Sequence, residues 1–192
     1  MRKRLNCISI FLIAISFCLS VYGEIDSSVR TVFLKTGVSF PVFGYWGDMD
    51  SGFKPSSDIA FMYIKDIDDT LSYGFQSGYS LGYKNRDLDM KVRIFSFHPE
   101  IFSWFSMIEK KYYLYLGPGI YQWTQVKSKD FSSTSRTEFG YNIGIGFLKE
   151  FKNNFRYGLN LELSHIFNIK TSNVNLDSLN NLSLNLVLAK KI

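Results

Sequence analysis

Large apolar residues and small or polar residues alternate along most of the chain. From Leu71 to Tyr83 the odd positions carry Leu, Tyr or Phe apart from one Ser, and the even positions carry Ser, Gly or Gln. The same split recurs over Thr137 to Phe147, Arg156 to Phe167 and Leu182 to Leu188. Because a period of two places successive side chains on opposite faces of a β-strand, each stretch is predicted to be a strand with one apolar face.

Four further segments show the same alternation more weakly. They are Val32 to Tyr45, Ile59 to Lys65, Leu88 to Phe97 and Tyr113 to Trp123, which brings the total to about eight strands. Many are longer than the five or six residues of an ordinary soluble strand and approach the 9–11 residues that cross a bilayer at a tilt. The pattern predicts an all-β fold, an antiparallel up-and-down transmembrane β-barrel.

The connections between these segments alternate between short and long. Lys65 to Asp69 and Lys152 to Asn154 are turn-like, whereas the longer connections are polar. The longer ones are Gly47 to Asp58, Val126 to Ser135 and Lys170 to Leu179. Short turns at one end and longer loops at the other are typical of membrane barrels. Phe97 to Lys111 departs from this alternation, and we predict a small interfacial helix there at the turn end.

The first 23 residues have the pattern of a signal peptide. Basic residues at positions 2–4 precede an apolar run from Leu5 to Leu19, and Val21 and Gly23 suit cleavage before Glu24. We therefore predict a cleaved leader, residues 1–23, and a barrel over 24–192; a retained N-terminal anchor is the alternative. The run is shorter than the about 20 residues that a spanning helix needs.

Removal of this leader changes the composition of the mature chain. Both cysteines, Cys7 and Cys18, lie within it, so the mature chain would form neither a disulfide nor a thiolate metal site. Three basic residues also leave, which lowers the formal net charge from +5 to +2. The basic composition is therefore no argument for a nucleic-acid partner.

The polar face of the predicted strands carries the charged residues among Gly and Ser. In an eight-stranded barrel the interior is just wide enough for side chains to fill, and opposite charges can neutralise one another there. We predict a pore-free interior that contains Lys35, Lys91, Arg93, Arg136, Glu138, Arg156 and Glu162. Aromatic residues make up 17% of the chain, and several lie near predicted strand ends, as in the girdles that anchor barrels at membrane interfaces.

The chain resembles the small eight-stranded outer-membrane β-barrel proteins of the porin-like superfamily. The resemblance rests on the leader, on Tyr113 to Tyr121, on the glycine-alternating strand Gly140 to Phe147 and on the closing leucine strand. It implies an outer-membrane location, contact with outer-membrane lipid and lipopolysaccharide, and delivery by the barrel-insertion machinery. One departure is the C-terminus, which ends Lys190-Lys191-Ile192 where such barrels often end on an aromatic residue.

A local resemblance to lipid A deacylase barrels centres on His165. That family carries a His-x-Ser-Asn motif, in which the Ser is the nucleophile, the His is its base and a carboxylate further on orients the His. Here His165 and Asn168 match, but Phe167 occupies the nucleophile position. Ser164 precedes the histidine and would point to the opposite face of the strand. Asp177 is the candidate carboxylate.

Other residues give no signal for chemistry. His98 precedes Pro99 at the end of a predicted strand and is expected in a turn or at the membrane interface. The acidic turn Asp66 to Asp69 lacks the remaining ligand spacing of a calcium loop. We expect no cofactor and no metal.

Three hypotheses for function follow. The first is a non-enzymatic outer-membrane barrel whose longer loops meet lipopolysaccharide, a host surface or another protein. The second is a deacylase-like barrel, in degenerate form, that uses His165. The third is a soluble periplasmic ligand-binding barrel with its apolar face turned inward.

Overall fold

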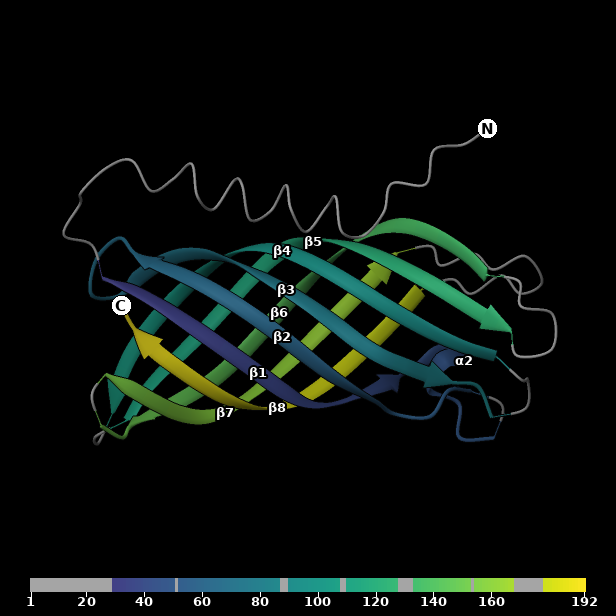
Figure 1. Cartoon of the computed structure of the whole chain (residues 1–192), viewed down its shortest axis with the longest axis horizontal. Coiled ribbons are helices and arrows are strands. Elements are labelled where there is room, and N and C mark those ends of the chain that lie inside the picture. Colours follow the sequence, from purple (N-terminus) through teal and green to yellow (C-terminus); the bar gives the residue numbers. More distant parts are fainter. Residues whose placement is uncertain are drawn as a thin grey trace.

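The computed structural model describes residues 29–50, 52–86, 90–107, 110–127, 133–152, 154–167 and 178–192. The predicted leader, residues 1–23, lies outside the described residues. The chain forms eight antiparallel strands in sequence order, and together they make a closed barrel (Figure 1). The strands are β1 (Arg30–Val42), β2 (Ser56–Asp66), β3 (Leu71–Lys84), β4 (Met90–Met107), β5 (Lys110–Lys127), β6 (Ser133–Glu150), β7 (Phe155–Phe167) and β8 (Ser178–Lys191).

Pairing between the first and last strands closes the sheet. The register of β1 with β8 runs from Thr31 opposite Lys191 to Val42 opposite Asn180. Both ends of the barrel chain therefore meet at one end of the molecule, which we call the turn end. The short helix α2 (Gly44–Gly47) lies at the opposite, loop end (Figure 1). Within the described ranges, no helix has the length and apolar character needed to cross a bilayer.

The predicted helix over Phe97 to Lys111 is wrong, because β4 continues through this stretch to Met107. Its aromatic residues keep alternating: Phe102 and Trp104 are buried in the interior, while Ile101 and Phe105 are exposed on the outside. Pro99 and Pro118 face each other at the register position where the ladder between β4 and β5 is interrupted. Because proline has no N–H to donate, the ladder loses hydrogen bonds at this point. The register is nevertheless the same on both sides of the gap, from Phe97 opposite Ile120 to Ile101 opposite Leu116.

A bulge near the loop end reverses the face of one predicted outer residue. The register between β3 and β4 shifts between Ser80 and Tyr83, and Gly82 between them has a φ of +132°. Because glycine tolerates this backbone conformation, the strand gains one residue and Tyr83 turns inward. Tyr83 is 1% exposed, although Tyr79 and Leu81 before it face outward as predicted.

Buried apolar side chains form two clusters inside the barrel, one at each end. The loop-end cluster comprises Trp46, Phe53, Tyr83, Met90, Val92, Ile94, Tyr121, Trp123, Ile166 and Leu179. The turn-end cluster comprises Phe33, Met62, Ile64, Phe102, Trp104, Tyr113, Tyr115, Leu148, Val187 and Ala189. Buried polar side chains that include Lys35, Gln76, His98, Glu100 and Glu162 occupy the middle of the barrel between the two clusters.

Inward-facing glycines on β6 make room for the turn-end tyrosines. A Cβ on Gly144 would lie 2.2 Å from Cζ of Tyr115, whereas a Cβ on Gly78 would first meet the Oγ of Ser96, at 2.8 Å. The Tyr115 ring is fixed by burial, but the serine hydroxyl can rotate away. Glycine at position 144 is therefore needed for the packing of the interior.

We expect Gly144→Ala to lower the free energy of unfolding by about 1–3 kcal/mol, the usual cost of overpacking a core. The matched control Gly78→Ala should cost less than about 0.5 kcal/mol, since both changes stiffen the unfolded chain alike. Urea unfolding in lipid vesicles, followed by tryptophan fluorescence, measures both. Equal losses for the two variants would contradict the packing of Tyr115 over Gly144.

Candidate functional site

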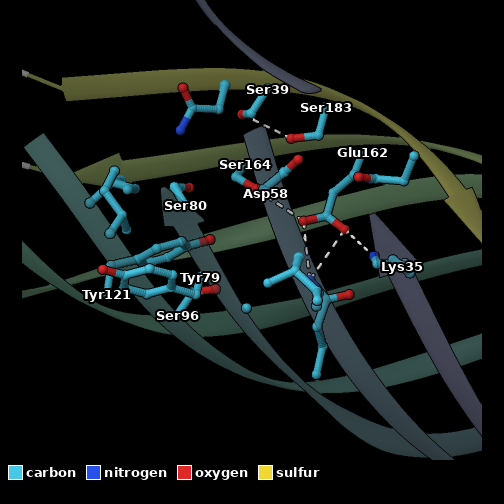
Figure 2. Close-up of a pocket in the computed structure, with 18 of the residues that line it drawn as sticks. Lys35, Ser39, Asp58, Tyr79, Ser80, Ser96, Tyr121, Glu162, Ser164 and Ser183 are labelled. Carbon is cyan, nitrogen blue, oxygen red and sulfur yellow. Dashed lines mark hydrogen bonds and ion pairs between the residues drawn. The ribbon is translucent and has the colours of Figure 1, made fainter. Parts of the chain in front are cut away.

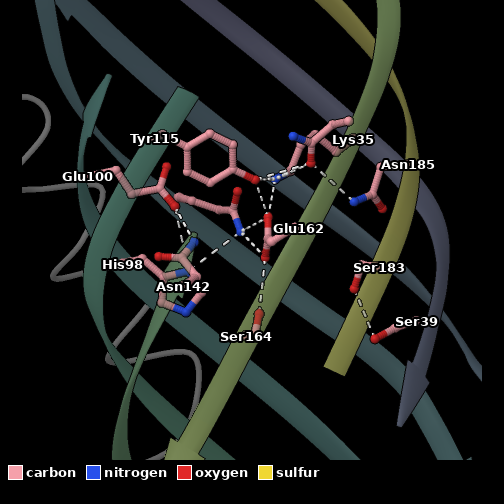
Figure 3. Close-up of polar contacts among 12 residues, drawn as sticks. Lys35, Ser39, His98, Glu100, Tyr115, Asn142, Glu162, Ser164, Ser183 and Asn185 are labelled. Carbon is pink, nitrogen blue, oxygen red and sulfur yellow. Dashed lines mark hydrogen bonds and ion pairs between the residues drawn. The ribbon is translucent and has the colours of Figure 1, made fainter. Parts of the chain in front are cut away.

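The polar middle of the barrel is organised around an ion pair between Lys35 of β1 and Glu162 of β7. The Lys35 Nζ lies 2.5 Å from Oε2 of Glu162, and both side chains are almost fully buried. Tyr115 of β5 donates its hydroxyl to the same carboxylate oxygen, and Lys35 donates to the Tyr115 oxygen at 3.0 Å (Figure 3). Three strands that are distant in sequence are thereby joined across the interior.

The second carboxylate oxygen of Glu162 is also used. Its Oε1 accepts hydrogen bonds from Nε2 of Gln76 at 3.2 Å and from the Ser164 hydroxyl at 3.3 Å. Lys35 makes a further hydrogen bond to Oδ1 of Asn160 at 3.4 Å. A buried charge is tolerated when it is paired and hydrogen-bonded in this way. The arrangement suits holding the barrel interior together, because Glu162 is fully engaged within the protein.

A second polar group lies beside this network and contains His98 and Glu100 of β4. Asn142 donates to Oε1 of Glu100 at 2.5 Å, and His98 Nδ1 lies 3.8 Å from the same oxygen. The His98 ring packs against Tyr121, with ring centroids 4.9 Å apart. Gln76 Nε2 lies 3.5 Å from His98 Nδ1 and so connects the two groups.

His98 is not the turn or interface residue that the sequence suggested. It is 1% exposed, and Glu100, which the sequence analysis missed, is 3% exposed. Both were misjudged because β4 was expected to end near Phe97. The usable signal was the alternation of His98, Glu100, Phe102 and Trp104, which continues past Pro99.

The seven charged residues predicted for the interior occupy four different environments, the last of which is the outer face. Lys35 and Glu162 are buried together. Glu138 and Arg156 are partly exposed and pair in register with the buried Tyr121 and Ala189, so they point inward nearer the barrel ends. Arg136 pairs with the buried Trp123 but is itself exposed at the loop end.

Lys91 and Arg93 belong to the outer face rather than to the predicted inner face. Their neighbours Val92 and Ile94 are buried, whereas Arg93 is exposed and Lys91 is partly exposed. The alternation in the first residues of β4 was too weak to show which of them face inward. The bulge at Gly82 also shifts the register between β3 and β4 by one residue. The prediction that these two cationic residues lie in the interior is therefore wrong.

His165 lies on the outer face of β7. Its Nδ1 is 2.7 Å from Oδ1 of Asn180, and its ring packs against Tyr141 and Phe167, with centroids 5.1 and 4.7 Å away. Ser164 is buried and points into the barrel. A hydrolytic triad needs a nucleophile and a carboxylate on the side of the histidine. Within the described strands the partner of His165 is an amide; Asp177 lies outside the described residues.

Comparisons with solved structures identify the same fold in several bacterial barrels. Neisserial surface protein A superposes with a TM-score of 0.66 at 14% identity, over 85% of this chain and 97% of that one. A major outer membrane protein of Thermus thermophilus gives 0.56 at 10% identity, over 87% and 100%. Ail of Yersinia pestis, in complex with the heparin analogue sucrose octasulfate, gives 0.52 at 14% identity, over 85% and 99%.

No protein-family model matches the chain, and no curated protein matches it. At these low identities the comparisons establish the fold alone. The predicted class is confirmed: the protein has the closed eight-stranded architecture of small outer-membrane β-barrels.

We expect Lys35→Met and Glu162→Gln each to lower the free energy of unfolding by about 3–5 kcal/mol, because each leaves one buried partner uncompensated. The double variant should lose clearly less than the sum of the two. Urea unfolding of the four proteins measures this coupling. Arg93→Met is the control and should change stability by about 0.5 kcal/mol or less; additive single effects would contradict the ion pair.

Proposed function

We propose that the protein is a non-enzymatic barrel of the bacterial outer membrane, anchored by its strands and presenting its loop end to the outside. The observation that carries this proposal is an apolar outer surface to which every strand contributes. Exposed apolar residues on the outer face include Leu34, Phe61, Tyr73, Ile101, Leu116, Ile143, Leu161 and Leu186, one from each strand.

Such a surface is suited to lipid rather than to water. Soluble monomers rarely expose continuous apolar patches larger than a few hundred Å². A closed sheet leaves no unpaired strand edge, which is the condition for a β-structure to span a bilayer. The apolar-out, polar-in arrangement is the reverse of a soluble barrel and favours the membrane hypothesis over a periplasmic binding barrel.

The filled interior supports a role as anchor rather than as a wide channel. Apolar clusters occupy both ends of the interior, with the buried polar network between them. In narrow barrels side chains leave little room for an aqueous passage. Interaction with large molecules is therefore assigned to the loop end and to the outer surface of the barrel next to it, which we call the loop-end rim.

Basic residues near the loop end support lipopolysaccharide as an outer partner. Lys54, Lys84, Arg86 and Arg93 are exposed there, next to the apolar outer surface. Their charge complements the phosphate groups of an anionic outer leaflet. We also infer delivery by the barrel-insertion machinery, because an incompletely closed sheet would expose unpaired backbone groups to lipid.

In cells that express the full chain, we expect the protein in the outer-membrane fraction. Unheated samples should migrate differently from boiled samples on detergent gels, since a closed sheet resists detergent until heat opens it. Fractionation followed by cold and boiled gels tests both points. A detergent-free soluble protein with unchanged migration would overturn the proposal and favour the periplasmic binding barrel.

Replacement of His165 separates the anchor from the deacylase-like alternative. We expect His165→Ala to leave the cellular lipid A species unchanged, because Phe167 offers no nucleophile and Asn180 holds the ring. Mass spectrometry of lipid A from cells with the wild-type chain, the variant and no chain measures this. A deacylated species that requires both the chain and His165 would establish the enzyme instead; the heat-dependent shift verifies that the variant is folded.

A further inference from the structure

A small polar cavity lies between the Lys35–Glu162 network and the loop-end cluster. Its volume is about 40 Å³, and its lining includes Asp58, Gln76, Ser39, Asn181 and Ser183 (Figure 2). By volume, this is room for a small ion or a few water-sized guests. Asp58 of β2, Ser164 of β7 and Ser183 of β8 are among the lining residues that Figure 2 labels.

Three oxygen atoms among these residues have no hydrogen-bond donor within the described part of the protein. They are Oδ1 of Asp58, Oε1 of Gln76 and Oδ1 of Asn181. Gln76 and Asn181 are 2% and 5% exposed. The Gln76 amide orientation is fixed, because its Nε2 donates to both oxygens of Glu162. Buried acceptors of this kind are costly unless a donor or a cation serves them.

The charges around the cavity are unbalanced. Among the described residues that face the middle of the interior, Lys35 is the cation, while Glu162, Glu100 and Asp58 are carboxylates. Lys35 is already paired with Glu162, and Glu100 accepts from Asn142. Asp58 is therefore the carboxylate beside the cavity that lacks a positive partner.

We propose that this cavity binds one small hard monovalent cation, such as Na⁺, between Asp58, Gln76 and Asn181. Carboxylate, amide and hydroxyl oxygens are the ligands that hard cations prefer. A proton on Asp58 would serve one of these oxygens and leave the amide oxygens of Gln76 and Asn181, which line the same cavity, without a partner. Among the residues that line the cavity, Lys35 balances one of the two carboxylates, Glu162 and Asp58, which leaves one negative formal charge; a single positive charge therefore fits better than a divalent ion.

The test is urea unfolding and refolding of the purified protein in detergent–lipid micelles. NaCl, LiCl, KCl and N-methyl-D-glucamine chloride are compared at one ionic strength, so that general screening is constant. We expect a higher urea midpoint in Na⁺ than in the organic cation, rising with the logarithm of the Na⁺ concentration, as binding to the native state requires. An identical midpoint in all four salts would overturn the proposal.

Two variants assign the effect to the cavity. Asp58→Asn keeps the shape of the side chain but removes the charge, and should abolish the dependence on Na⁺. Glu138→Gln removes an inward carboxylate nearer the loop end and should leave the dependence intact. If Asp58→Asn does not fold, Asn181→Ala is used in its place. It should raise at least tenfold the Na⁺ concentration that gives the same increase in the urea midpoint. An unchanged dependence of the urea midpoint on Na⁺ in Asp58→Asn or Asn181→Ala would contradict the proposed site.

Discussion

Closure of the sheet between β1 and β8 is the constraint on which the rest of the structure depends. In lipid, no water is present to satisfy a free backbone N–H or C=O, so a spanning sheet must pair every strand on both sides. The register from Thr31–Lys191 to Val42–Asn180 completes that pairing. Once the sheet is closed, each side chain must face either the surroundings or a narrow interior, and the period of two along each strand follows.

The narrow interior then determines where polar groups can be placed. Apolar clusters at both ends separate the middle of the barrel from solvent, so Lys35 and Glu162 interact in a medium of low dielectric constant. In such a medium a fully hydrogen-bonded ion pair is strong, and an unpaired charge is costly. The loop-end cluster is completed by Trp46 of α2, which stacks on Phe53 at 4.2 Å. Positive φ values at Phe43 and Gly44 turn the chain inward to place it.

The sequence was sufficient for the strand count, the antiparallel order and most of the outer face, because alternation over β3, β6, β7 and β8 is strong. It was insufficient where a local feature interrupts the period. The bulge at Gly82 inverts Tyr83, and Pro99 hid the continuation of β4 and with it His98 and Glu100. Contacts such as Tyr115 with Glu162 join distant strands, so no local pattern contains them.

The outward position of Lys91 and Arg93 gives the barrel a different charge distribution from the one that the sequence predicted. With these two cations inside, the interior would be close to balanced; with them outside, the described carboxylates of the middle layer outnumber Lys35. The same two residues join Lys84 on the outer rim of the loop end, where Lys84 and Lys91 are register partners. Because the first half of β4 faces the opposite way from the prediction, the interior is more acidic, and the loop-end rim more basic, than the sequence suggested. The acidic interior must be compensated from within, as by the cation proposed above, while the basic rim is available to anionic groups outside the barrel.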